Sequence, residues 1–444
     1  MSDLLKKYNR QGPRYTSYPP VPFWKNTPTS GDWITHLKKI YNDEEGMDLY
    51  VHIPFCQKLC YYCGCNRIVT KNYSIQNNFV ETLLLEWNLY CEKLGFIPKI
   101  NSLHFGGGTP TFLTPENLEK LIQVLTLNKK DTFMGSIEID PRNTSIAHLD
   151  CFKKNGIKRI SLGIQDFNPD VQMAINRMQP FEMVEVLMQE LRAREFESIN
   201  FDVIYGLPKQ TPETIEETFR LVRKLRPDLI AFYSYAHLPD RLKNQHLIKN
   251  EDLPSPAGKS ALYELGKELL NADGYLEVGM DHFSLPDNFL YLAKMARKLH
   301  RNFMGYVDKK SPILVGLGPS SISDSSMSFI QNEKGLNEYE LKIKSGELAI
   351  VTGHTHEEKD LSAQEIILNL MCNNETILDH RADIPYWAEI EAELHSMQTD
   401  GLLKVGRDKV TILPNGLKYV RSIAMVFDFY FREKMPRDKF SQTI

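Results

Sequence analysis

The sequence has little of what would place it in a membrane, in an oxidising compartment or on nucleic acid. No apolar run approaches the ~20 residues that a membrane-spanning helix needs, so we expect no membrane partner. The seven cysteines are an odd number in 444 residues, and no hydrophobic secretion signal is seen. We therefore expect a reducing, cytoplasmic setting without a disulfide framework. The net charge of −4 gives no reason to expect a nucleic-acid partner.

Short apolar segments alternate with amphipathic helices between residues 45 and 240. Helices are expected after Thr114-Pro115 and Thr211-Pro212, because threonine is a favourable N-cap and proline a favourable first helical residue. Successive strand–helix units predict a parallel sheet with right-handed crossovers. Six units are too few for a closed eight-stranded barrel, so we predict the α/β class and a partial (β/α)6 barrel. The expected strands are Leu49–Ile53, Ser102–Phe105, Ser136–Asp140, Arg159–Ile164, Ile199–Tyr205 and Leu229–Tyr233.

The chain is longer than one hydrophobic core usually supports, so we predict several regions. These are an N-terminal arm over 1–44, the partial barrel over 45–290, an extension of this core over 291–354 and a C-terminal lid domain over 355–444. The last region combines helices with a hairpin-like stretch over 400–412. This pattern is typical of a mostly helical, winged-helix-like α+β domain.

Four cysteines lie within ten residues, directly after the first expected strand. Cys56, Cys60 and Cys63 have the spacing C-x3-C-x2-C, and an aromatic residue, Tyr62, precedes the third. Thiolates hold iron–sulfur clusters, and three of them leave one iron open for another ligand, as in a catalytic metal site. The spacing is similar to the signature of radical S-adenosylmethionine (SAM) enzymes. It therefore predicts a 4Fe-4S cluster with SAM as its exchangeable ligand.

A structural zinc site that uses all four thiolates is the alternative for this cluster of cysteines. Zinc sites usually pair two short knuckles across a longer loop, and no second knuckle is found here. The role of Cys65 stays open. It could be a residue on the substrate side, or a further thiolate ligand of the cluster, which its spacing from Cys63 disfavours. The remaining cysteines, Cys91, Cys151 and Cys372, lie in apolar helical contexts that favour ordinary buried thiols.

Polar or glycine residues lie at the end of each expected strand. Barrel enzymes place their chemistry at this end, so these residues are expected to form one site. Glycines let a ligand approach the backbone closely, carboxylates suit hydroxyl and amino groups, and arginine suits a carboxylate. A tight turn, strand-end caps and surface ion pairs are the alternatives. The candidates are Gly107, Gly108, Thr109, Glu138, Gln165, Arg177 and Asp202.

Further cations and phenols are candidates for binding an anionic substrate. His237 is a separate candidate, for which a hydrogen-bonded core histidine is the favoured interpretation. Each of the others, taken singly, is better explained as a structural or solvated residue, whereas the set, facing an open side of the barrel, is a candidate receptor for carboxylates. They are Arg14, Tyr15, Tyr18, His282, His300 and Arg301.

Over nearly its whole length the sequence resembles the oxygen-independent coproporphyrinogen III oxidase family of radical SAM enzymes. The resemblance depends on the arm motif and the cysteine segment, including its Cys63-Gly-Cys65-Asn66 extension, and on motifs along the rest of the chain. These are Gly12–Pro19, Tyr50–Asn66, Phe105–Pro110, Ser136–Arg142, Gly163–Phe167, Asp202–Pro212, Tyr235–Pro239, Gly279–Phe283, His300–Phe303 and Ser321–Ser323.

The resemblance implies an oxidoreductase of anaerobic haem biosynthesis. It implies oxidative decarboxylation of two propionate groups of coproporphyrinogen III to vinyl groups, which gives protoporphyrinogen IX. It also implies a monomer with an unidentified electron donor and acceptor, in which the arm and the C-terminal domain close over the substrate. Cys56, Cys60 and Cys63 would bind the cluster. Two SAM molecules would be bound by Tyr50, Tyr62, Gly107, Gly108, Thr109, Glu138, Gln165, Arg177, Asp202, Ala236 and Ile322.

One departure from the family pattern concerns the substrate. Family members commonly have a basic pair where this chain has Ala363-Gln364. A haem chaperone, or another radical SAM relative that acts on haem, is therefore an alternative. A zinc-stabilised nucleic-acid-binding protein is a second one, but its recognition helix, around 386–397, would carry Glu389, Glu391 and Glu393, the wrong charge for phosphate.

Overall fold

The computed structural model describes residues 3–379, 381, 384–433 and 440–443. Two compact units are formed. The larger unit comprises Lys25–Asp273 and Ser311–Thr355, and the smaller comprises Met1–Trp24, Gly274–Lys310 and His356–Ile444. Both are built from separate stretches of the chain. The ends of the predicted arm and C-terminal domain, at 1–2, 434–439 and 444, lie outside the described residues, as do 380, 382 and 383.

A mixed sheet forms the centre of the larger unit, with the strand order β16-β15-β14-β13-β1-β4-β5-β6-β7-β8. From β13 to β8 neighbouring strands run parallel, whereas β14, β15 and β16 are antiparallel. The six predicted parallel strands are confirmed, while β13 is an additional parallel neighbour of β1 that was not predicted. The bounds are β1 Met47–Ile53, β4 Ile100–Gly107, β5 Lys129–Ile139, β6 Ile157–Gln165, β7 Ser198–Tyr205, β8 Leu229–Ser234, β13 Ile313–Leu317, β14 Ile322–Ser325, β15 Ser328–Asn332 and β16 Ile350–Thr355.

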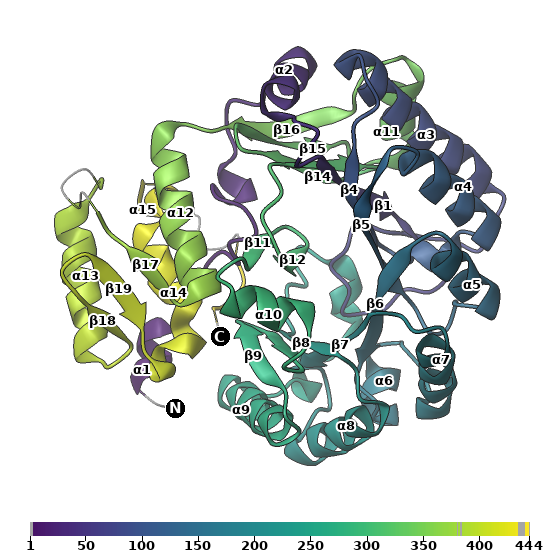
Figure 1. The fold of residues 1–444 in the computed structure, drawn as a ribbon. Helices are drawn as coiled ribbons and strands as arrows, with labels where there is room; N and C mark the ends of the chain where they lie inside the picture. The colour runs from purple at the N-terminus through teal and green to yellow at the C-terminus, as the bar shows by residue number, and fades with distance from the viewer. Residues whose placement is uncertain (1–2, 380, 382–383, 434–439, 444) are drawn as a thin grey trace. The chain divides into compact units, whose positions relative to one another are not determined.

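Helices cover the outer side of these parallel strands in chain order (Figure 1). Helix α4 begins after Thr114, whose side chain accepts a hydrogen bond from the Asn117 N–H, and it buries Leu118, Ile122 and two further leucines. Helix α8 likewise begins after an N-cap threonine, Thr211, and buries an apolar face. The predicted N-caps are therefore confirmed. The helices are α2 Ser30–Ile40, α3 Ile75–Leu94, α4 Pro115–Leu125, α5 Ile146–Lys154, α6 Pro169–Ala174, α7 Phe181–Ala193, α8 Pro212–Leu225, α9 Pro256–Ala272 and α11 Leu336–Lys344.

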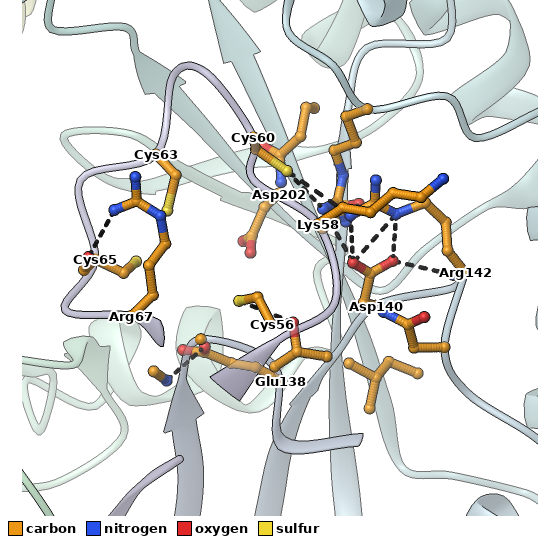
Figure 2. Close-up of a pocket in the computed structure, with 18 of the residues that line it drawn as sticks. Cys56, Lys58, Cys60, Cys63, Cys65, Arg67, Glu138, Asp140, Arg142 and Asp202 are labelled. Atoms are coloured by element: carbon orange, nitrogen blue, oxygen red, sulfur yellow. Dashed lines mark hydrogen bonds and ion pairs between the residues drawn. The ribbon is translucent and has the colours of Figure 1, made fainter. Parts of the chain in front are cut away.

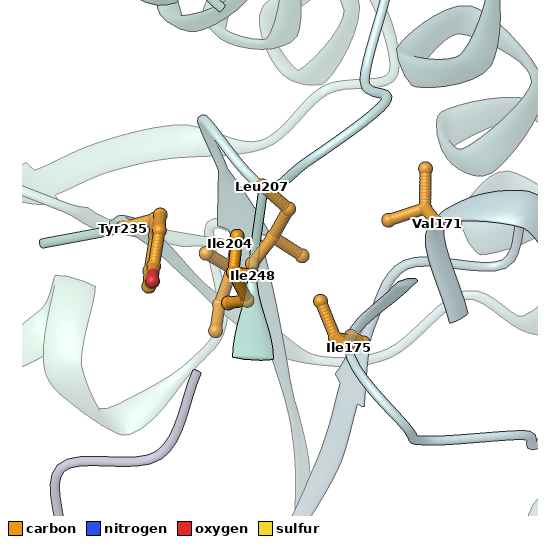
Figure 3. Packing of buried hydrophobic residues seen from close by; sticks show 6 residues of the cluster. All are labelled: Val171, Ile175, Ile204, Leu207, Tyr235 and Ile248. Carbon is orange, nitrogen blue, oxygen red and sulfur yellow. The ribbon is translucent and has the colours of Figure 1, made fainter. Parts of the chain in front are cut away.

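An apolar cluster supports the segment that carries the cysteines. Its six buried members, drawn in Figure 3, come from α6 and the residue directly after it, from β7 and the turn after it, and from the loops that follow β8. Tyr61 and Tyr62 of the cysteine segment pack against this cluster. The segment is thus anchored on the core through its aromatic residues. The members are Val171, Ile175, Ile204, Leu207, Tyr235 and Ile248.

The smaller unit is mostly helical and contains a small antiparallel sheet, ordered β17-β19-β18. Strands β18 (Leu403–Val405) and β19 (Lys409–Ile412) pair as predicted for the hairpin-like stretch. The unit also contains two short hairpins, β9–β10 and β11–β12. Its other elements are α1 Asp3–Tyr8, β9 Leu276–Gly279, β10 His282–Ser284, α10 Phe289–Met295, β11 His300–Asn302, β12 Gly305–Val307, α12 Glu358–Asn373, β17 Glu375–Ile377, α13 Trp387–Thr399, α14 Val420–Ala424 and α15 Phe429–Glu433.

The N-terminal arm is ordered against the C-terminal helices of the smaller unit. Arg421 donates hydrogen bonds to the carbonyl oxygens of Gly12 and Pro13. The hydroxyl of Tyr15 donates to Asp428 (3.0 Å), and the hydroxyl of Tyr18 accepts from the Phe429 N–H. Tyr15 and Tyr18 are buried. Their phenols therefore hold the arm in place, which is the structural interpretation of these two candidates.

No helix among the described residues combines the length and apolarity that crossing a bilayer requires.

Candidate active site

A hollow of about 270 Å³ lies at the carboxyl ends of the parallel strands in the larger unit. Figure 2 shows the thiol groups of Cys56, Cys60 and Cys63 pointing toward this common space. Most of the predicted site residues line it, whereas Tyr50, Ala236 and Ile322 do not. The predicted residues along its wall are Cys56, Cys60, Cys63, Tyr62, Gly107, Gly108, Thr109, Glu138, Gln165, Arg177 and Asp202.

The cysteine segment is held by side chains that come from distant parts of the chain. Asn176 donates to the carbonyl oxygen of Leu59 (2.7 Å), and Asn244 donates to that of Cys63 (3.0 Å). Gln245 donates to the carbonyl oxygen of Tyr62 (3.0 Å). These amides satisfy backbone groups that no sheet partner reaches, so the loop has a defined shape before any ligand binds. Sequence reasoning assigned no role to Asn176, Asn244 or Gln245.

The glycines at the end of β4 fix the cysteine segment beside the sheet. The N–H groups of Gly108 and Thr109 donate to the carbonyl oxygens of Ile53 and Phe55 (2.8 and 2.9 Å). A Cβ at Gly108 would lie 2.8 Å from the Pro54 carbonyl oxygen, so only glycine allows this approach. The N–H groups of Gly108 and Thr109 are thus already used within the protein, where they hold the cysteine segment.

The cysteines differ in how readily they form thiolates, which are the species that bind metals. Burial raises the pKa of the Cys56 thiol to about 11, although its Sγ lies 3.4 Å from the Thr109 hydroxyl. A hydrogen bond with Cys65 lowers the pKa of Cys63 to about 6 against the opposing effect of burial. Cys65 thus contacts Cys63 and lines the hollow. Binding of iron would have to displace a proton from Cys56.

Two arginines and one aspartate surround Cys60. Asp140, directly after β5, pairs with Arg142 (2.6 Å) and Arg177 (3.2 Å). Both guanidinium groups also lie 3.7 Å from the Cys60 Sγ. Burial alone would raise the pKa of Asp140, but the two arginines lower it to about 2. Asp140 is therefore ionised at neutral pH. The Asp140-Pro-Arg142 sequence after a strand was the signal for this pair, but it was not interpreted.

Glu138 is held by two groups at the opposite wall. Its Oε2 accepts from the Gly107 N–H (3.3 Å), and its Oε1 lies 3.5 Å from Nε2 of His104. The other ring nitrogen of His104 lies 2.7 Å from the Ser136 hydroxyl. The ring of Tyr50 stacks on His104, with centroids 5.8 Å apart. Tyr50 thus supports this wall from behind it, and His104 is a site residue that sequence reasoning missed.

Asp202 supplies a carboxyl group whose pKa is raised, in contrast to the lowered pKa of Asp140. Burial, and secondarily the charge of Glu138, raises its pKa to about 7. Its oxygens accept hydrogen bonds from Asn200 (2.8 Å) and Ser161 (3.4 Å). Near neutral pH this group can therefore either donate or accept a hydrogen bond. A ribose hydroxyl is a suitable partner for such a group.

The chemistry of this wall fits a cluster and an amino-acid ligand. The hollow is lined by Cys56, Cys60, Cys63 and Cys65, and it contains an ionised carboxylate and guanidinium groups. The Nε of Arg177 is buried and has no hydrogen-bond partner among the described residues. A buried polar group of this kind normally has a partner, so an anionic ligand group or a bound water is expected there. The residues present therefore fit a 4Fe-4S cluster and the carboxylate of SAM.

The remaining candidates lie elsewhere. In the smaller unit Arg14 pairs with Asp281, Asp281 contacts His282 (2.7 Å), and Arg301 donates to the Arg14 carbonyl oxygen (3.1 Å). His300, also in the smaller unit, is near Lys310, and burial lowers its pKa to about 4.

The ring nitrogens of His237 contact Tyr235 and Asn250, in agreement with a structural histidine. Ala363 and Gln364 stand where family members commonly have a basic pair. Gln364 donates a hydrogen bond to the Tyr18 carbonyl oxygen (3.2 Å), and Ala363 is buried.

Comparison with known proteins agrees with this site. Residues 50–222 match the model of the Radical SAM superfamily. The chain is 38% identical to oxygen-independent coproporphyrinogen III oxidase of Pseudomonas aeruginosa, with 100% of this chain and 98% of the relative covered. It is 36% identical to the protein of the same name from Escherichia coli K12, with 99% and 98% covered.

A solved structure shows the same fold. Coproporphyrinogen III oxidase from Escherichia coli, described as a radical SAM enzyme, matches with a TM-score of 0.88 at 35% sequence identity. The match covers 94% of this chain and 97% of that chain. The similarity thus extends over both units and well beyond the cysteine motif. The chain belongs to the oxygen-independent coproporphyrinogen III oxidase family of radical SAM enzymes.

Proposed function

We propose that this protein converts coproporphyrinogen III to protoporphyrinogen IX without oxygen, by oxidative decarboxylation of two propionate side chains. The names of its full-length relatives support the substrate. The observation that carries the proposal is that Cys56, Cys60 and Cys63 line one hollow together with Arg177 and with Asp140 and Asp202, whose carboxyl pKa values are shifted in opposite directions. Zinc bound by four thiolates would not require the carboxyl and guanidinium groups.

The reaction needs a reagent that no side chain provides. The β-carbon of a propionate has an unactivated C–H bond, which a general base cannot deprotonate usefully. The reduced cluster and SAM together supply a radical that can remove this hydrogen atom. Each propionate then loses CO2 and one further electron to an external acceptor, and a vinyl group remains. An external one-electron donor must reduce the cluster for each turnover; donor and acceptor are unidentified partners.

The protein's own residues bind and orient the reagents. Cys56, Cys60 and Cys63 hold the cluster in this proposal. Arg177 would bind the SAM carboxylate through its unpartnered Nε, and Asp202 a ribose hydroxyl. The site for two SAM molecules comprises Tyr50, Tyr62, Gly107, Gly108, Thr109, Glu138, Gln165, Arg177, Asp202, Ala236 and Ile322.

Of these residues, Tyr50, Ala236 and Ile322 do not line the hollow, and the contacts of Tyr50 and Ala236 indicate how they could act. Tyr50 lies behind His104, and the Ala236 carbonyl oxygen accepts a hydrogen bond from Gln245 (3.1 Å). Tyr50 would therefore act indirectly: its ring supports His104, and His104 contacts Glu138. The setting is proposed to be cytoplasmic and the protein a monomer.

The test is anaerobic turnover of the reconstituted protein. About four irons per chain are expected from one cluster. With the cluster reduced by dithionite, and with SAM, coproporphyrinogen III and a one-electron acceptor supplied, the expected products are 5′-deoxyadenosine and the divinyl product in a fixed ratio. Haem binding without turnover would instead favour a chaperone. Stoichiometric zinc with no 5′-deoxyadenosine would refute the proposal.

A further inference from the structure

Cys60 differs from the other two cysteines of the C-x3-C-x2-C motif in the charges next to it. Two guanidinium groups, from Arg142 and Arg177, each lie 3.7 Å from its Sγ. At Cys56 the neighbouring polar atom is instead the Thr109 hydroxyl, 3.4 Å away. Figure 2 shows Arg142 and Asp140 on the side of the hollow occupied by Cys60. Among the described residues, guanidinium groups at hydrogen-bonding distance from a sulfur are thus found at Cys60, while Arg67 and Arg177 act electrostatically on Cys63.

The charges around Cys60 do not cancel. Asp140 is the shared carboxylate partner of both arginines, at 2.6 Å from Arg142 and 3.2 Å from Arg177. The side chains are 7% exposed for Asp140, 12% for Arg142 and 8% for Arg177, so water screens them poorly. Two cations and one anion leave one positive charge in excess beside the sulfur. Buried charge of this kind is normally compensated by a partner of opposite sign.

Arg142 is fixed in this position by a short local structure. Its Nε and Nη2 donate to both oxygens of Asp140 (2.9 and 2.6 Å), and its backbone N–H donates to the same carboxylate (3.0 Å). The Asp140 carbonyl oxygen accepts from the Asn143 N–H and the Thr144 hydroxyl. A bidentate arginine–carboxylate contact is rigid and directional. The guanidinium therefore faces Cys60 because Asp140 holds it there.

We propose that the Asp140–Arg142 pair sets the reduction potential of the cluster bound through Cys60. This inference rests on the proposed function, which assigns Cys60 as a cluster ligand. Reduction adds one electron, from an external one-electron reductant, to the oxidised 2+ cluster and yields the 1+ state. A cation that donates a hydrogen bond to a ligand sulfur stabilises the reduced state more than the oxidised state, and such contacts are known determinants of cluster potential. Arg142 makes reduction easier, and Asp140 both positions Arg142 and limits its effect.

A purely structural role for the pair makes a different prediction. If Asp140 and Arg142 only hold the turn after β5, substitutions at either residue would lower iron content or stability but leave the potential of any bound cluster unchanged. An electrostatic role instead predicts shifts of opposite sign for the two residues. The sign of the shift therefore separates the two roles.

The experiment is a redox titration of the anaerobically reconstituted full chain, monitored by the electron paramagnetic resonance signal of the reduced cluster. Arg142→Gln removes the cation, and the ratio of reduced to oxidised cluster at a fixed potential should fall about tenfold, which equals a shift of ~59 mV for one electron. Asp140→Asn removes the anion but keeps a side-chain oxygen that can accept a hydrogen bond from Arg142, so the cation stays in place and this ratio should rise. Arg142→Lys keeps the charge and should lie between Arg142→Gln and the wild type.

The matched control is Arg220→Gln, in an arginine–glutamate pair on the surface of α8, which should leave the potential unchanged. The proposal is overturned if Arg142→Gln and Asp140→Asn have the wild-type potential or shift it in the same direction. It is also overturned if all three variants at the pair lose iron, since the role is then structural. If the wild type itself binds no cluster, it is the proposed function that fails.

Discussion

Each unit buries an arginine, and the two arginines have opposite surroundings. In the smaller unit Arg421 donates through all three of its nitrogens to the carbonyl oxygens of Gly12, Pro13 and Gln442. In the larger unit Arg177 faces the hollow, and its Nε has no partner among the described residues. A fully bonded guanidinium joins segments of the chain, whereas one with a free donor at a hollow is suited to a ligand.

The electrostatics of the two arginines differ in the same way. Burial, together with the nearby cations Arg14 and Arg301, lowers the pKa of Arg421 to about 9. Burial also opposes the charge of Arg177, but the carboxylate of Asp140 outweighs it and raises the pKa of this group. Neutral carbonyl dipoles compensate the first cation, and a full negative charge compensates the second. Burial of charge by itself is thus no sign of a ligand site.

The largest expected effect is loss of the cluster from the larger unit alone. Cys60→Ser replaces a thiolate with a hydroxyl that does not ionise at neutral pH, so iron after reconstitution should fall from about four per chain to less than one. Protection of the arm amides against hydrogen exchange should be unchanged, because Arg421 and its partners are intact. Iron retained at the wild-type level would remove Cys60 from the proposed ligands.

Glu86, buried in the larger unit, should make stability depend on pH. It accepts hydrogen bonds from Gly318, Asn332 and Tyr339, yet burial raises its pKa from 4.5 to about 7. The folded state then binds the proton more tightly than the unfolded state. Stability should therefore fall as the pH rises from about 4.5 to about 7 and stay low above that, by up to about 3 kcal/mol.

Urea unfolding at several pH values, followed by hydrogen exchange in α3, measures this dependence. Glu86→Gln should flatten it, since an amide does not titrate in this range. In the smaller unit Asp428, whose pKa is also raised to about 7 by burial, should retain its own dependence in that variant. A slope unchanged by Glu86→Gln would contradict the assignment.

Arg421→Met should loosen the arm. The carbonyl oxygens of Gly12 and Pro13 would lose their donor, at a cost of about 2 kcal/mol. Hydrogen exchange across residues 9–18 should therefore speed up by more than tenfold. Arg177→Gln, in the other unit, should leave this exchange unchanged and weaken SAM binding measured by calorimetry. If the two variants had the same effects on exchange and SAM affinity, the contrast between the arginines would be refuted.

The smallest effect is expected at His104, which touches Glu138 without facing the hollow itself. His104→Ala removes one of the two contacts that hold the Glu138 carboxylate, so SAM affinity should fall several-fold while iron content is retained. His237→Ala is the control, because its partners Tyr235 and Asn250 lie outside the wall of the hollow. Equal losses of affinity in both variants would deny His104 a positioning role.

Short-range patterns predicted much of this molecule, because they depend on residues close in sequence. The spacing of Cys56, Cys60 and Cys63, the N-caps at Thr114 and Thr211 and the alternation of strands with helices are all of this kind. Placing polar residues at or near strand ends also brought Glu138, Gln165 and Asp202 to one hollow. The physical reason is that parallel strands of one sheet bring their carboxyl ends to the same edge.

Contacts between distant residues were decided by the tertiary structure. The pairing of β13 with β1 joins residues more than 250 positions apart, and no local signal specifies it. The Cys60–Arg142 contact and the hydrogen bonds from Asn244 to the cysteine segment depend in the same way on how loops from different strands pack. Sequence alone determined which chemical groups the chain carries and the order of its strands and helices. Only folding decided which arginine meets a sulfur and which meets a carbonyl oxygen, because burial and partner geometry set the energy of a charge.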